Sequence, residues 1–145
     1  MWEFEHSVRA NASRERVWAA WTDVASWPSW NPGVGLVELD GPVTEGAMGR
    51  IRAVGGPAST LRVLTIEPKK RFVTEASERL VQLRFEHELA DADAGQVLIT
   101  HRVRMTGPAT PVLRHTIGAR LRRSIPTAVA ALVELAALPP PRQNG

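Results

Sequence analysis

Two long segments of alternating polarity, residues 80–90 and 96–106, limit the possible folds of this chain more than any other feature. The turn-forming residues Asp91–Gly95 between them indicate a β-hairpin. Because a slip of one residue would turn every side chain to the other face, one register is predicted for both arms. It pairs Leu89 with Ile99, His87 with His101, Phe85 with Val103, and Leu83 with Met105.

The residues before the hairpin predict further strands and one early helix. Residues 2–10 alternate with a period of two, as a strand with one buried face does. Residues 14–22 follow an Asn-Ala-Ser cap and place Val17, Trp18 and Trp21 on one helical face, with a second short turn after them. Turn-rich sequences separate four more expected strands: 36–40, 48–54, 61–67 and 72–77.

A long amphipathic helix is predicted over residues 109–138, and Pro126 inside it should kink or weaken it. The order of elements predicts an α+β fold, in which a curved, seven-stranded antiparallel sheet surrounds this helix and two short helices follow the first strand. The apolar stripe of the long helix comprises Leu113, Ile117, Leu121, Ile125, Val129 and Leu132, and it excludes Arg114, Arg122 and Arg123.

Composition and charge exclude several classes of protein. The 145 residues suit one domain, expected at 1–138, with a tail at 139–145 that we expect to be disordered. The absence of Cys excludes disulfides and thiolate chemistry. A net charge of +3 without a recognition motif predicts no binding to nucleic acid, and no segment suits a membrane span. No secretory signal is visible, so we expect a cytoplasmic protein. The excess of Arg over Lys and the many Ala residues indicate a GC-rich bacterial genome, and the formation of a homodimer stays open.

Several segments together resemble the START-like superfamily, also called SRPBCC or polyketide cyclase/dehydrase, whose fold is known as helix-grip. The resembling residues are the opening strand with Ala12–Asp23 after it, Trp27–Pro32, Glu67–Pro68 with Arg71–Val73, and the hairpin around His87 and His101. The resemblance covers residues 2–138 and implies a cavity between the sheet and the last helix. Its members include aromatase/cyclases, lipid-transfer modules and hormone receptors, so the activity stays open.

Three histidines, His6, His87 and His101, fall on apolar strand faces, where an imidazole can donate or accept a hydrogen bond. His87 and His101 should be cross-strand neighbours, and a helix-grip sheet would place the first strand, with His6, beside the last. Three roles are open: structural side chains at the core edge, polar contacts to a ligand, or metal ligands. Metal is the least expected, because neither Cys nor close His spacing accompanies them, and no cofactor is predicted.

The leading hypothesis is binding of a hydrophobic small molecule, lipid-like or aromatic and polyketide-like. The second is a polyketide cyclase or dehydratase, a lyase in which His87 or His101 transfers a proton. The third is a noncatalytic domain that binds a partner through the Arg-rich side of the last helix. Neither a Gly-x-Ser-x-Gly motif nor an inward carboxylate pair supports hydrolysis.

Eight residues are expected to contact the ligand in the first two hypotheses. They are His6, Trp30, Phe85, His87, His101, Val103, Ile117 and Leu121. For Trp30 the alternative role is to fix its Pro-rich turn against the sheet.

Overall fold

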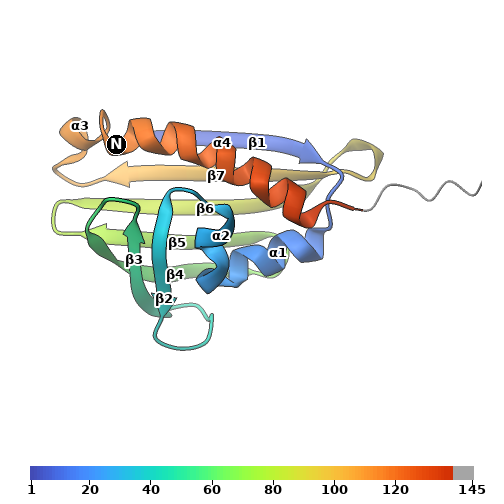
Figure 1. The fold of residues 1–145 in the computed structure, drawn as a ribbon, viewed down its shortest axis with the longest axis horizontal. Coiled ribbons are helices and arrows are strands. Elements are labelled where there is room, and N and C mark those ends of the chain that lie inside the picture. The colour runs from blue at the N-terminus through green and yellow to red at the C-terminus, as the bar shows by residue number, and fades with distance from the viewer. Residues whose placement is uncertain (139–145) are drawn as a thin grey trace, which may run out of the picture.

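The computed structural model describes residues 1–138, and the tail expected at 139–145 lies outside them. Seven strands form one antiparallel sheet, as predicted, in the order β1-β7-β6-β5-β4-β3-β2 (Figure 1). The strands are β1 (Trp2–Ala10), β2 (Val34–Leu39), β3 (Met48–Ala53), β4 (Ala58–Glu67), β5 (Arg71–Glu78), β6 (Val81–Asp91) and β7 (Val97–Thr106). The helical segments are α1 (Arg14–Thr22), η1 (Val24–Ser26), α2 (Trp27–Trp30), η2 (Asp93–Gly95), α3 (Thr110–Leu113) and α4 (Ile117–Ala136).

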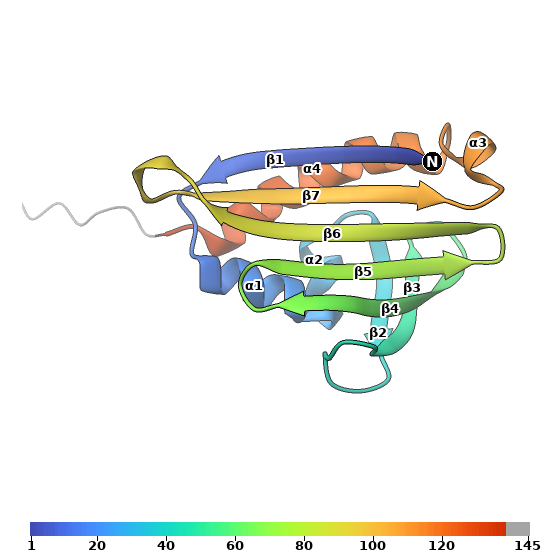
Figure 2. The same cartoon turned by 180° about the vertical axis from the view of Figure 1, so that it is seen from behind.

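The helices α1, α2 and α4 lie on one face of a curved sheet. In Figure 1, α4 crosses in front of β1 and β7, and α1 and α2 lie in front of the middle strands. Figure 2 shows the same strands from behind, with these helices on the far side. Register shifts in β2 and β4 mark irregularities of the kind that bends a strand, so the sheet curves around the helices. The predicted helix-grip arrangement is confirmed.

The β6–β7 hairpin has the predicted register. Leu89 pairs with Ile99, and His87 pairs with His101. Strand β1 then pairs with β7 so that His6 lies opposite His101. The three inward histidines therefore form one row across β6, β7 and β1.

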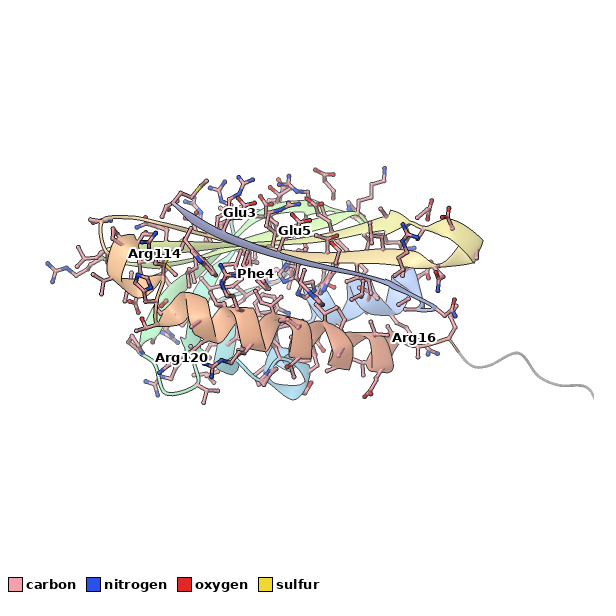
Figure 3. All side chains as sticks on the ribbon, turned by 90° about the horizontal axis from the view of Figure 1, so that it is seen from above. Glu3, Phe4, Glu5, Arg16, Arg114 and Arg120 are labelled. Carbon is pink, nitrogen blue, oxygen red and sulfur yellow. The ribbon has the colours of Figure 1, made fainter. Side chains whose placement is uncertain are left out.

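Alternation along the strands separates a charged outer face from the inner face. Figure 3 shows Phe4 directed toward α4, with Glu3 and Glu5 directed to the opposite side. On that outer face Arg102 donates to the buried Glu86 at 2.6 Å and to Glu5 at 3.0 Å. Charged groups of β1, β6 and β7 thus pair on the outer face, which leaves the inner face free for apolar side chains.

The core is most complete where the second half of α4 meets α1. Val129 and Leu132 of α4 and Val17 and Trp21 of α1 are wholly buried. The amide of Ser13, the N-cap of α1, donates to the carbonyl of Ala136 at 2.8 Å, so the start of α1 is joined to the end of α4. This end of the molecule is therefore closed by packed side chains.

The prediction of one continuous helix over 109–138 is wrong. The chain forms the short α3, a turn, and then α4, which contains Pro126 and ends at Ala136. The turn arises because the amide and the hydroxyl of Thr116 both donate to the carbonyl of Leu113, at 3.1 and 3.3 Å. That carbonyl is therefore satisfied outside the helical pattern. Neither α4 nor any other helix within residues 1–138 is long and apolar enough to cross a membrane.

Candidate functional site

A cavity of about 750 Å³ lies between α4 and the inner face of the sheet. Its apolar walls come from strands β5 and β6 and from the first half of α4. They include Ala76, Leu83 and Phe85 on the sheet, and Ile117, Leu121 and Ile125 on the helix. A space of this size suits a drug-sized organic molecule.

The apolar stripe of the last helix serves two different purposes along its length. Ile117 and Leu121 are only half-buried and line the cavity, whereas Val129 and Leu132 are wholly buried in the core. Small residues on the facing strands, such as Ala76, do not reach across to the helix. The stripe therefore seals the core at one end and leaves an open space at the other.

His87 and His101 lie side by side in the cavity wall. Their ring centroids are 4.6 Å apart and the rings are nearly perpendicular, at 83°. Nδ1 of His87 lies 3.1 Å from the carbonyl oxygen of Phe72. A carbonyl only accepts, so Nδ1 of His87 carries the proton and Nε2 is left as an acceptor.

The tautomer of His101 is set by Trp21. The indole N–H of Trp21 donates to Nε2 of His101 at 3.1 Å, so the proton of His101 is on Nδ1. Within residues 1–138, neither His101 Nδ1 nor His87 Nε2 has a hydrogen-bond partner, and neither is sealed off by protein atoms. The pair therefore offers the cavity one donor and one acceptor.

Both imidazoles are neutral at pH 7. Burial lowers the pKa of His87 to about 4, although its hydrogen bond to Phe72 acts in the opposite direction. Burial also lowers the pKa of His101 well below its ordinary value, and the nearby His87 and His6 lower it further. The wall thus carries hydrogen-bonding groups without a net charge.

The structure brings five of the eight predicted contact residues to the cavity. These are Phe85, His87, His101, Ile117 and Leu121. His6 and Val103 are not among the lining residues. His6 is half-buried on β1, and Val103 is wholly buried and paired with Phe85.

Trp30 is also absent from the cavity wall. Its ring packs edge-on against His101, with centroids 6.3 Å apart, so it lies next to a lining residue. Its indole N–H is buried without a partner among the described residues. This position agrees with the alternative role, in which Trp30 fixes its turn against the sheet.

Sequence reasoning missed several polar residues around the cavity. Glu78 lines it and accepts a hydrogen bond from the hydroxyl of Ser59 at 3.0 Å. The expected strand stopped at Ser77, although continuing the alternation of Phe72 and Ala76 by two residues would have placed Glu78 inward. Arg120 and Arg123 also line the cavity, from α4. No group of three metal-ligating side chains occurs within residues 1–138.

Comparison with known proteins assigns the chain to a family. Residues 1–137 match the family described as polyketide cyclase/dehydrase and lipid transport. The chain belongs to this family. The match includes every element from β1 to α4, so the family spans the whole domain that carries the cavity. Among curated proteins, none is a significant match to this member of the polyketide cyclase/dehydrase and lipid transport family.

Solved structures share the fold of this polyketide cyclase/dehydrase and lipid transport domain at low sequence identity. A hypothetical protein from Helicobacter pylori has a TM-score of 0.77 and 13% identity, covering 92% of this chain and 86% of its own. Norcoclaurine synthase from Thalictrum flavum has a TM-score of 0.71 and 12% identity, covering 92% and 85%. A START superfamily protein from Mycobacterium smegmatis has a TM-score of 0.69 and 15% identity, covering 91% and 97%. At these identities the likeness shows the fold.

Proposed function

We propose that this protein binds a hydrophobic small molecule, ring-containing or lipid-like, in the cavity between α4 and the sheet. The observation that carries the proposal is an apolar cavity of about 750 Å³ with two neutral imidazoles in its wall. The volume exceeds the roughly 300 Å³ at which ligand pockets begin. It therefore favours a ligand-binding domain over one that binds a partner through its outer surface alone.

The two imidazoles define what the ligand presents to them. His101 offers Nδ1–H and His87 offers the lone pair of Nε2. A hydroxyl group can accept from the first and donate to the second, and so can a neighbouring carbonyl and enol acting together. Because unpaired polar groups in an apolar wall are costly, a ligand with such a group should bind better than a pure hydrocarbon.

The test measures binding of Nile red, an uncharged dye whose fluorescence rises in apolar surroundings. We expect saturable binding to the wild type and a clear loss in Leu121→Trp, since the larger ring fills the cavity. The control is Leu135→Trp, the same substitution at an exposed position of α4. Equal binding by both variants, with unchanged melting temperatures, would contradict the proposal.

Native mass spectrometry identifies the ligand class directly. Protein purified from its own host is sprayed with and without prior denaturation. A co-purifying lipid or aromatic compound that is absent from Leu121→Trp would support binding in the cavity.

A polyketide cyclase or dehydratase is the second candidate, favoured by the adjacent imidazoles and by the family. There one imidazole would take a proton from the substrate while the cavity folds it. The lowered pKa of His87, about 4, makes that imidazole a weak base at neutral pH, which favours binding over catalysis. Conversion of a poly-β-ketone by the wild type but not by His87→Gln, followed by mass spectrometry, would support the enzyme.

A further inference from the structure

We propose that the ligand carries an ionised acid group, and that Arg120 and Arg123 of α4 bind this group at the cavity rim. The inference rests on the proposed binding function and adds the chemical class of the ligand. Both arginines line the cavity and are also exposed on the surface, so they lie where the cavity wall meets solvent.

The helix places these arginines beside the apolar stripe. Arg120, Ser124 and Thr127 are spaced four and three residues apart and line the cavity together with Arg123. Residues at this spacing share one side of a helix. The first half of α4 therefore presents an apolar row formed by Ile117 and Leu121, bordered by a row of hydrogen-bond donors.

No carboxylate in the described structure neutralises the two arginines. None of the ion pairs within residues 1–138 includes Arg120 or Arg123, and the sequence contains no Asp or Glu between Asp93 and Glu134. Glu78, a carboxylate in the cavity wall, accepts a hydrogen bond from Ser59 on the adjacent strand β4. Arg120 and Arg123 therefore have no ion-pair partner among the described residues, and Glu78 is the one carboxylate among the lining residues of the cavity.

Neighbouring arginines of the same region have contacts that the rim pair lacks. The guanidinium of Arg122 lies 5.5 Å from the ring centroids of both Trp2 and Phe4, which joins α4 to β1. Arg114 donates to the ring of His115 at 3.4 Å. Arg120 and Arg123 have no such contact among the described residues, and they are the two of these four arginines that line the cavity. This correlation favours a role at the cavity over a merely solvated helix face.

The resulting ligand is amphipathic. Its acid group would lie at the rim, where a guanidinium can form charge-assisted hydrogen bonds to a carboxylate or a phosphate. Its apolar body would occupy the space lined by Phe85 and Leu121 and extend toward the imidazoles. Carboxylate and phosphate share this chemistry, so the experiment includes both.

The experiment measures displacement of Nile red by three dodecyl compounds: dodecanoic acid, dodecyl phosphate and methyl dodecanoate. Each is titrated at low and at physiological salt against the wild type, the double variant Arg120→Gln/Arg123→Gln, and Arg62→Gln. Arg62 is exposed on β4, is not a lining residue and has no ion pair among the described residues, so its variant controls for loss of surface charge. Unchanged Nile red affinity shows that each variant retains its cavity.

We expect at least one of the two acids to bind the wild type about tenfold more tightly than the ester. That preference should disappear in the double variant, persist in Arg62→Gln and weaken with salt. If both acids bind no more tightly than the ester, or if the double variant keeps the preference, this inference is wrong while the proposed function stands. If Nile red does not bind the wild type, the proposed function itself is wrong and this inference with it.

Discussion

The indole N–H of Trp21 donates a hydrogen bond to Nε2 of His101 at 3.1 Å, inside the core. The two residues are 80 positions apart in the sequence, on α1 and β7. This bond decides which nitrogen of His101 is available to a ligand, and the carbonyl of Phe72 does the same for His87. The donor and the acceptor in the cavity wall are therefore set by Trp21 and Phe72, which are not lining residues themselves.

Replacing Trp21 by Phe should destabilise the protein and remove the hydrogen bond that holds the proton of His101 on Nδ1. We expect a loss of about 1–3 kcal/mol, because a buried hydrogen bond and part of a buried ring are removed. In the wild type, ¹⁵N chemical shifts should show His101 protonated at Nδ1. A wild-type His101 protonated at Nε2 would contradict the assignment.

Stability should fall as the pH drops from about 6.5 to 4. In that range the histidines of the unfolded chain take up protons, whereas His87 in the folded protein, with its pKa of about 4, stays neutral. The unfolded state then binds more protons, so the free energy of unfolding decreases, by up to roughly 3 kcal/mol for His87 alone. Above about 6.5 this contribution is constant.

Urea unfolding between pH 4 and 8 measures this effect. His87→Phe should show a shallower loss toward low pH than the wild type does, whatever its stability at pH 7. His115→Gln, at an exposed histidine, serves as the control. Identical pH dependence of the wild type and His87→Phe would show that His87 is not the cause.

Replacing His101 by Phe should preserve the fold and alter ligand preference. We expect weaker binding of 2-naphthol and unchanged binding of naphthalene, because only the first can accept from Nδ1 of His101. A thermal melt beside both titrations separates the roles. A purely structural histidine would lower stability and leave the ratio of the two affinities unchanged.

Truncating Leu132 and Leu121 of α4 to Ala should lower the free energy of unfolding by different amounts. Leu132→Ala removes a wholly buried side chain and should cost about 2–5 kcal/mol. Leu121→Ala enlarges a space that is already open, so we expect a loss below about 1.5 kcal/mol. Urea unfolding of both variants provides the comparison. Equal costs would mean that Leu121 is packed like a core residue.

Local patterns in the sequence suffice to predict the strands, the first helix and the register of the central hairpin. These follow from short-range periodicity, since alternation fixes which side chains share a face and a hairpin couples two neighbouring segments. The juxtaposition of His87 and His101 is such a case. The family resemblance supplied the closure of β1 against β7, which places His6 beside them.

Where the inner face of the sheet is packed, and where it stays open, depends on how distant segments come together in three dimensions. Periodicity shows that Leu121 and Leu132 lie on one side of a helix, but not whether side chains reach across from the curved sheet. The Trp21–His101 bond joins residues 80 positions apart, and the cavity that Arg120 lines is formed by α4 together with distant strands. The break before α4 follows instead from the local hydrogen bonds of Thr116 to Leu113, which hydrophobic periodicity does not reveal. The distance between the strands and α4 depends on how strongly the sheet bends, and no local pattern in the chain encodes that distance.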